Sequence, residues 1–240
     1  MALPIIQQPV YEVFLQSLNK SVKFRPFLVK EEKILLMAIE SEETEPLVNA
    51  IKQIITNCLL DDIDVNALPM FDVQMLFLNI RMKSVSETIS LTFKCEKLMP
   101  DSEEVCNMIN EYDLSLGKIV YELDSAHTNN IMLSDDVGVR LKYPTLTNLD
   151  MLLNLRVDDS IKLVARYVDY IFDNDQTYTR DQFTDENLEE FLSNLSNDQF
   201  KTVLKFFETA PKVVIKDTVQ CVKCGSNHEI YSEDLYRFFL

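Results

Sequence analysis

Four cysteines in the sequence have the spacing and the context of metal ligands. Cys221 and Cys224 form a CxxC motif that a glycine follows, and two thiolates in such a turn reach one zinc ion at about 2.3 Å. Structural zinc takes four ligands, so this motif supplies half of a site. The sequence therefore predicts that Cys95 and Cys106, at the two ends of a loop, complete the set, with His228 as a substitute for one of them.

Other states of these thiols stay open. Cys95 and Cys106 lack the two-residue spacing of a second zinc knuckle, so reduced thiols that hold no metal are the alternative. A redox role is disfavoured because the CxxC motif lies between expected strands and not at a helix N-terminus. Cys58 falls on the apolar stripe of an expected helix and is predicted to lie in the core.

No other group of residues suggests chemistry. His127 lies in a polar loop (DSAH), but neighbours in sequence seldom form a hydrolytic triad. Residues 173–184 begin like a calcium loop, yet Tyr178 stands where an EF-hand needs glycine and Thr184 where it needs glutamate. The chain has only three glycines, and phosphate-binding fingerprints are absent. We therefore expect no enzyme, no small-molecule substrate and no cofactor other than structural zinc.

The charge of the chain restricts its partners. The formal net charge is −16, and a nucleic-acid binder needs Lys and Arg to replace phosphate counterions, so nucleic acid is disfavoured. The same charge keeps the chain soluble and would steer it toward a basic partner. No apolar run is long enough to span a membrane, and no secretory signal begins the sequence. We expect a protein without membrane contact that is made and kept in a cytosol.

Hydrophobic periodicity predicts helices near both ends and strands in the middle. A short β segment at 11–24 comes first. Helical stripes follow, and they are expected at 30–40, 47–59 and 71–82. Alternating residues predict strands at 89–93, 119–123 and 137–143.

Helical period returns after Pro144 and predicts a helix at 161–172, followed by two helices that Thr184 and Ser196 cap. A strand is expected at 213–219 and a short helix at 233–240. The fold class is therefore α+β. Helical N- and C-terminal parts surround a central antiparallel β unit, and a CxxC hairpin lies near the C-terminus. The parts are 1–87, 88–143 and 144–240, which could form one integrated domain.

Several segments together resemble the baseplate hub protein family of T4-like contractile-tailed phages. The segments that carry the resemblance are residues 22–33 (VKFRPFLVKEEK), 68–85, 131–146 (IMLSDDVGVRLKYPTL), 183–212 and 235–239 (LYRFF). Their order and spacing cover nearly the whole chain. The resemblance implies a hub assembly factor or minor hub component, with no catalytic residues to carry over. The loop that holds Cys95 and Cys106 departs from the paired-cysteine arrangement that is commoner in this family.

The resemblance also implies partners and a location. Other baseplate hub proteins or the tape-measure protein would bind the chain, in the host cytoplasm during tail assembly or in the virion. Aromatic and arginine anchors dominate interfaces, so the candidate contacts are Phe24, Arg25, Phe27, Phe238 and Phe239. The alternative is that these side chains pack into the protein's own core.

Two other functions remain as rivals. One is a zinc-ribbon adaptor that binds a host or phage protein, such as part of the transcription machinery. The other is a cysteine- or metal-dependent enzyme.

Overall fold

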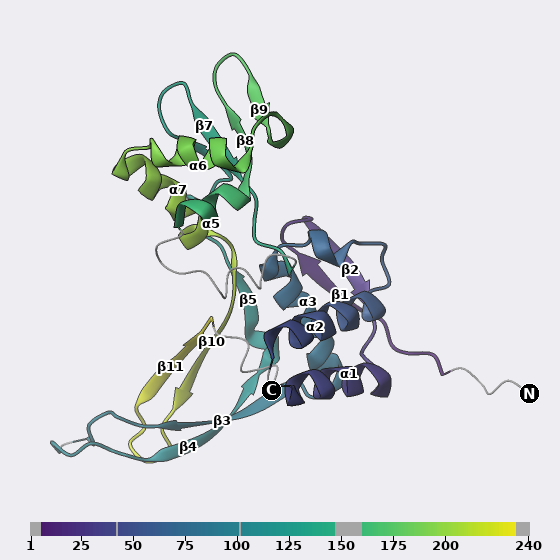
Figure 1. Cartoon of the computed structure of the whole chain (residues 1–240). Helices are drawn as coiled ribbons and strands as arrows, with labels where there is room; N and C mark the ends of the chain where they lie inside the picture. The colour runs from purple at the N-terminus through teal and green to yellow at the C-terminus, as the bar shows by residue number, and fades with distance from the viewer. Residues whose placement is uncertain (1–5, 42, 101, 147–159, 234–240) are drawn as a thin grey trace, which may run out of the picture. The chain divides into compact units, whose positions relative to one another are not determined.

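The computed structural model describes residues 6–41, 43–100, 102–146 and 160–233, and it confirms the α+β class. The chain divides into two compact units, which are described separately (Figure 1). Unit 1 holds Met1–Val65, Phe71–Glu122 and Lys212–Leu240, and unit 2 holds Asn66–Met70 and Leu123–Pro211. In the part of the chain that is described, no helix has both the length and the apolar character that a membrane span requires.

Unit 1 begins with a β-hairpin and three helices. The hairpin pairs β1 (Tyr11–Leu15) with β2 (Lys20–Phe24), and it is followed by α1 (Val29–Glu40), α2 (Thr44–Cys58) and α3 (Met70–Ser84). A short 3-10 helix, η1 (Val65–Ala67), precedes α3. These elements confirm the predicted β segment and the three predicted helices.

Helix α3 buries apolar side chains on more than one side, which explains why its stripe in the sequence is so broad. Its buried residues include Leu76, Phe77, Leu78 and Ile80, which are successive or nearly successive positions of one helix. A helix that is hydrophobic all round lies inside a core and not on its surface. The stripe of α2 is narrower and buries Ile54, Ile55 and Cys58, so Cys58 is a core residue as predicted.

A buried carboxylate, Asp72, joins three elements of unit 1. It accepts hydrogen bonds from the backbone N–H groups of Gln16 and Ser17 at 3.0 Å each, from the Ser17 hydroxyl, and from the Tyr121 hydroxyl at 2.6 Å. Gln16 and Ser17 belong to the β1–β2 turn, where Asn19 has a φ of 49°. Burial and the Asp72 hydrogen bond raise the pKa of Tyr121. Asp72 therefore fixes the hairpin turn against α3 and the strand that carries Tyr121.

The rest of unit 1 consists of two hairpins, whose loops bring distant parts of the chain together (Figure 1). Strand β3 (Thr88–Lys94) pairs with β4 (Ile109–Ser115). Strand β10 (Lys212–Gln220) pairs with β11 (Asn227–Ser232) on one edge and with β5 (Ile119–Glu122) on the other. The 3-10 helix η2 (Leu116–Lys118) connects β4 to β5.

Unit 2 packs helices against a four-stranded antiparallel sheet. The strand order is β6 (Asn130–Met132), β7 (Gly138–Leu141), β8 (Val168–Phe172) and β9 (Thr177–Thr179). The helices are α5 (Ser160–Tyr167), the 3-10 turn η5 (Arg180–Gln182), α6 (Asp185–Ser193) and α7 (Asn197–Thr209). Their shared core contains Val139, Leu188 and Val203.

The predicted caps of α6 and α7 are confirmed. The Thr184 hydroxyl accepts the N–H of Asn187, and the Ser196 hydroxyl accepts the N–H of Gln199. The Gln199 side chain also accepts the N–H of Ser196 at 2.9 Å, which completes a capping box.

The helix predicted at 161–172 is wrong in its second half. Helix α5 ends at Tyr167, and Val168–Phe172 form a strand. The apolar run has helical spacing, but its β-branched and aromatic residues also suit a strand, and pairing of Ile171 with Val139 in β7 decides between them. Residues 173–175 consequently form the β8–β9 turn and do not end a helix.

Strands predicted in the range 88–143 belong to three different sheets. β3 and β4 form a hairpin of their own, β5 joins β10, and β6 and β7 join β8. The two compact units consequently have boundaries other than 87 and 143. The helix predicted at 233–240 lies outside the described residues, apart from Glu233.

Candidate metal centre

The structure brings together the four cysteines that the sequence singled out. The sulfur atoms of Cys95, Cys106, Cys221 and Cys224 all lie within 4.8 Å of one another. The Cys95 and Cys224 sulfurs are 3.6 Å apart, and those of Cys106 and Cys221 are 3.7 Å apart. A tetrahedral ion with four thiolates at about 2.3 Å would place the sulfurs about 3.8 Å apart. The cluster therefore has the size and the ligand number of a tetrahedral metal site.

Two loops supply the four sulfurs. Cys95 and Cys106 lie in the loop between β3 and β4, which its own backbone bonds hold closed: the N–H of Cys95 donates to Met108 at 2.8 Å, and the N–H of Cys106 donates to Lys97 at 2.8 Å. Asn107, with a φ of 52°, turns the chain back toward β4. These bonds bring two cysteines together although they lack the spacing of a knuckle.

The second pair of sulfurs lies in the tight turn between β10 and β11. The N–H of Gly225 donates to the Cys221 carbonyl at 2.9 Å, and Gly225 has a φ of 72°, which L side chains rarely adopt. The N–H of Val222 donates at 3.0 Å to the side chain of Asn110, a residue of β4 that is only 2% exposed. Asn110 thus ties the turn to the other hairpin. Sequence inspection missed it, and its only signal was a polar residue at a core-facing strand position.

The cluster is closed to solvent on most sides. Cys95, Cys106 and Cys221 are buried, Cys224 is partly buried, and Met99 and Met108 pack against them. An apolar shell of this kind limits access to solvent, as at structural metal sites. The arrangement suits a site that holds two hairpins together more than one that admits a substrate, because catalytic zinc keeps an open position.

Local hydrogen bonds make the two halves of the cluster electrostatically different. The N–H groups of Cys224 and Lys223 lower the pKa of Cys221 to about 6, and the hydroxyl and N–H of Ser226 lower the pKa of Cys224. Burial raises the pKa of Cys95 to about 12 and also raises the pKa of Cys106. The turn therefore stabilises thiolates, whereas the loop keeps its cysteines neutral until a cation compensates their charge.

His228 lies beside the cluster as a fifth group. Its Nε2 atom is 3.2 Å from the Cys95 sulfur, and its ring packs at 4.9 Å on Phe93 of β3. With four sulfurs already in place, the imidazole is positioned to donate a hydrogen bond to Cys95, a common way to support a ligand thiolate. Among the described residues, the mutually close ligand atoms are the four sulfurs, and His228 is not one of that group.

The candidate contacts near the N-terminus are not available to a partner. Phe24 is 1% exposed and Phe27 is 8% exposed, so both pack into the core of unit 1. Sequence pattern alone did not separate these two uses, because a buried anchor and an exposed one consist of the same residue types. Phe238 and Phe239 lie outside the described residues.

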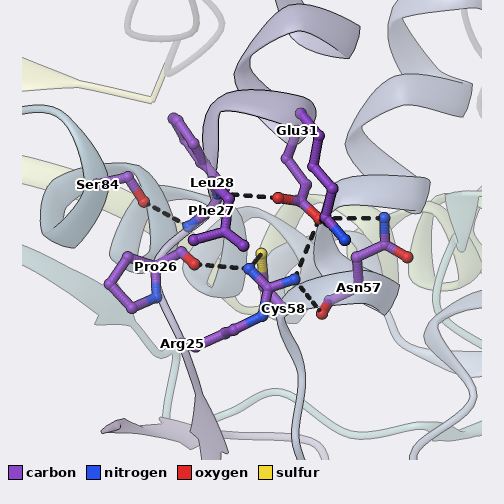
Figure 2. A network of polar contacts seen from close by, with 9 residues as sticks. Arg25, Pro26, Phe27, Leu28, Glu31, Asn57, Cys58 and Ser84 are labelled. Carbon is purple, nitrogen blue, oxygen red and sulfur yellow. Dashed lines mark hydrogen bonds and ion pairs between the residues drawn. The ribbon is translucent and has the colours of Figure 1, made fainter. Parts of the chain in front are cut away.

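Arg25 is engaged within the protein as well (Figure 2). Its guanidinium donates to Glu31 at 3.1 Å, to the carbonyl of Asn57 at 2.9 Å and to the carbonyl of Pro26 at 2.8 Å. Glu31 is completely buried, and its other oxygen accepts the N–H of Leu28 at 2.9 Å. Burial alone would raise the pKa of Glu31, but the Leu28 hydrogen bond and Arg25 hold it below its ordinary value. Arg25 therefore links the end of β2 to the start of α1 and the end of α2.

His127 contacts two hydroxyl groups and two aromatic rings of unit 2. Its Nδ1 atom lies 2.9 Å from the Thr209 hydroxyl, and its Nε2 atom lies 2.8 Å from the Tyr143 hydroxyl. The ring packs on Tyr143 and Phe206. Burial lowers the pKa of His127, so the neutral ring is favoured. The residue that the sequence placed in a polar loop is a partly buried structural histidine of unit 2.

Comparison with known proteins identifies the family. A family model described as "T4 bacteriophage base plate protein" matches residues 8–240, which is nearly the whole chain. Comparison with curated proteins and with solved structures gives no match. The match includes both units and both cysteine-bearing loops, and it agrees with the resemblance in the sequence. The chain belongs to the T4 bacteriophage base plate protein family and is a structural protein of a phage baseplate.

Proposed function

We propose that this protein acts at the hub of the phage baseplate, as a minor hub component or as an assembly factor that binds other hub proteins or the tape-measure protein. The observation that carries the proposal is the family match over residues 8–240. The four-cysteine cluster supports it indirectly, because three of its cysteines are buried and the fourth is partly buried, which suits a structural site better than a catalytic one. The protein would act in the host cytoplasm during tail assembly, and as a component it would stay in the virion.

Protein mass spectrometry of purified phage particles tests this proposal. Peptides of this chain in amounts comparable with those of other hub proteins would make it a virion component. Peptides absent from particles but abundant in infected lysate, together with a loss of tails on deletion of the gene, would make it an assembly factor. Normal tails after deletion would overturn the hub proposal.

We propose that the C-terminal pair Phe238 and Phe239 contacts the partner hub proteins. Because Phe24 and Phe27 are buried, these two residues are what is left of the predicted aromatic contacts. Replacement of both by serine should abolish co-purification with hub proteins while the circular dichroism of the chain stays unchanged. Unchanged co-purification would remove them from the interface.

We further propose that the cysteine cluster binds one structural Zn²⁺ ion through Cys95, Cys106, Cys221 and Cys224. The sulfur separations of 3.6 and 3.7 Å carry this proposal, because they match a tetrahedral thiolate site before any ion is placed. The ion would join the β3–β4 loop to the β10–β11 turn. Bound metal would also offset the burial of Cys95 and Cys106, whose neutral forms are otherwise favoured.

Metal analysis of the full chain tests the zinc proposal. Protein purified under reducing conditions should contain about one zinc ion per chain, as a single four-ligand site requires. Cys221→Ser with Cys224→Ser should lose it, and Cys58→Ala is the matched control because Cys58 lies in the core away from the cluster. The absorption spectrum after cobalt substitution should show four thiolate ligands and stay so in His228→Gln. A wild-type chain that takes up no zinc would refute the proposal.

A zinc-ribbon adaptor remains the second candidate, since the two hairpins and their paired loops are what such a ribbon needs. The adaptor would carry zinc in the same stoichiometry. It would co-purify with a host or non-structural phage protein in preference to hub proteins, and deletion of the gene would leave tails intact.

A further inference from the structure

Two close sulfur contacts in the cluster join different hairpins. Cys95 of the β3–β4 loop lies 3.6 Å from Cys224 of the β10–β11 turn, and Cys106 lies 3.7 Å from Cys221. A disulfide bond is about 2.05 Å long, so each pair needs to close by less than about 2 Å to become covalent. The pairs that the sequence would suggest, within the CxxC motif or within one loop, would leave the hairpins unlinked.

We infer that Cys95 with Cys224, and Cys106 with Cys221, are two disulfide sites that form when the released particle meets peroxide outside the cell. The environment in this inference rests on the proposed role in the virion, because cytosolic thiols are kept reduced whereas virion surfaces are exposed to oxidants. The pairing itself rests only on the cluster. Both bonds connect the same two loops that a metal ion would connect, so the two hairpins stay joined after oxidation.

The oxidation balances with hydrogen peroxide as the oxidant. The Cys224 thiolate attacks one oxygen of the peroxide, the O–O bond breaks, and a sulfenic acid and hydroxide form. The Cys95 thiol loses its proton as its sulfur attacks the sulfenic sulfur, the S–S bond forms, the S–O bond breaks, and the leaving hydroxide takes up that proton as water. A proton from solvent converts the first hydroxide into water, so one thiolate, one thiol, one peroxide and one proton give one disulfide and two waters. The Cys106–Cys221 pair repeats this sequence with a second peroxide.

Exposure sets the order of the two bonds. Cys224 is the only member of the cluster that is partly exposed, whereas Cys95, Cys106 and Cys221 are buried. Peroxide therefore reaches Cys224 first, and the Cys95–Cys224 bond should form before the Cys106–Cys221 bond.

Trypsin makes the pairing directly readable, because it places each cysteine of the cluster on its own peptide. These peptides are residues 95–97, 98–118, 217–223 and 224–237, and Cys58 lies on a fifth, 53–81. The full chain is treated with a chelator and reductant, transferred to graded peroxide, alkylated, and mapped without reduction. We expect 95–97 linked to 224–237 at low peroxide, followed by 98–118 linked to 217–223, with Cys58 alkylated throughout.

Each other outcome overturns the inference. Linkage of 217–223 to 224–237 would show that the CxxC motif oxidises within itself, and linkage of 95–97 to 98–118 would show the same for the loop. The exchanged cross pairs, 95–97 with 217–223 and 98–118 with 224–237, would contradict pairing along the 3.6 and 3.7 Å contacts. Cys224→Ser should remove only the first linkage and leave 98–118 joined to 217–223, and loss of both would contradict independent sites.

The same experiment separates this inference from the zinc proposal. A zinc-loaded chain should oxidise more slowly than the chelated chain and release its ion as the linkages appear. If the chain binds no zinc, the two samples oxidise at the same rate, and the identity of the linked peptides still decides the pairing.

Discussion

Replacement of Arg25 by methionine should show how strongly the buried Glu31 depends on it. Methionine keeps an unbranched apolar stem but removes the guanidinium that donates to Glu31 at 3.1 Å. Glu31 has no exposed surface, and removal of one partner of a buried ion pair costs about 3–5 kcal/mol. The carbonyl of Asn57 loses its donor as well, which adds on the order of 1 kcal/mol.

The cost should depend on pH in a definite direction. In the wild type, the pKa of Glu31 is lowered, so its contribution to stability is present above the ordinary carboxyl pKa and is lost as the pH falls through the lowered value. Without Arg25, the Leu28 hydrogen bond and the exposed Lys30, 3.5 Å away, are the remaining groups that lower the pKa of Glu31, so burial raises this pKa relative to the wild type. The variant then relieves its uncompensated charge by protonation as the pH falls. The stability difference between Arg25→Met and the wild type should therefore be largest near neutrality and shrink toward acid.

Urea-induced unfolding followed by circular dichroism at neutral and acidic pH measures this difference. Lys23→Met is the matched control, because Lys23 lies two residues before Arg25 on β2, its side chain is 58% exposed, and its ion pair with Glu12 spans 4.0 Å. Such exposed pairs contribute about 0–1 kcal/mol, so the control should be nearly neutral. A double-mutant cycle with Glu31→Gln should give a clear coupling energy. A cost for Arg25→Met below about 1 kcal/mol, or one that does not change with pH, would refute the reasoning.

Three further variants test other features of the fold. Gly138→Ala should destabilise unit 2 by about 1–3 kcal/mol, because the added Cβ atom would lie 2.7 Å from the Cε2 atom of the Phe172 ring. Chemical denaturation measures this loss of stability, and an unchanged stability would mean that the Phe172 ring moves aside freely. Asp72→Asn should lower the free energy of unfolding by about 2–3 kcal/mol, since an amide offers one acceptor oxygen where the β1–β2 turn and Tyr121 together need two. A thermal unfolding midpoint equal to that of the wild type would contradict this. Burial lowers the pKa of His127, so the neutral His127 ring contributes stability to the fold that is present above about pH 6.5 and is lost as the pH falls below that value. His127→Gln should flatten the melting temperature between neutral and mildly acidic pH, and a profile parallel to the wild type would exclude His127 as the cause.

Local signals predicted the helices and their caps well. The stripe of α2 and the hydroxyls of Thr184 and Ser196 act within one or two turns of chain, so their physics is contained in a short window of sequence. The strand at Val168–Phe172 was missed because its choice between helix and strand depends on β7, which is distant in sequence. The distribution of β3–β7 over three sheets depends on the same kind of distant pairing.

The candidate site shows the same division. The CxxC motif is a local signal, and with it the sequence predicted all four sulfurs of the cluster. The sequence did not predict Asn110 because its structural role is to accept a hydrogen bond from Val222, which lies in another hairpin. The sequence left Phe24 and Phe27 open between partner contact and core because exposure is a property of the folded chain, and an apolar residue near a proline fits either surface or core.

The pairing of the two hairpins has a consequence for synthesis of the protein. Cys95 and Cys224 are 129 residues apart, and the Glu122 and Lys216 side chains, on paired strands, are 94 apart. At about 5–20 residues per second, a ribosome needs on the order of 6–26 s to travel from the first of these cysteines to the last. During that time Phe93 has no His228 ring to pack against. The nascent chain thus passes through a period in which the edge of β5 is unpaired, because its partner β10 is made about 90 residues later.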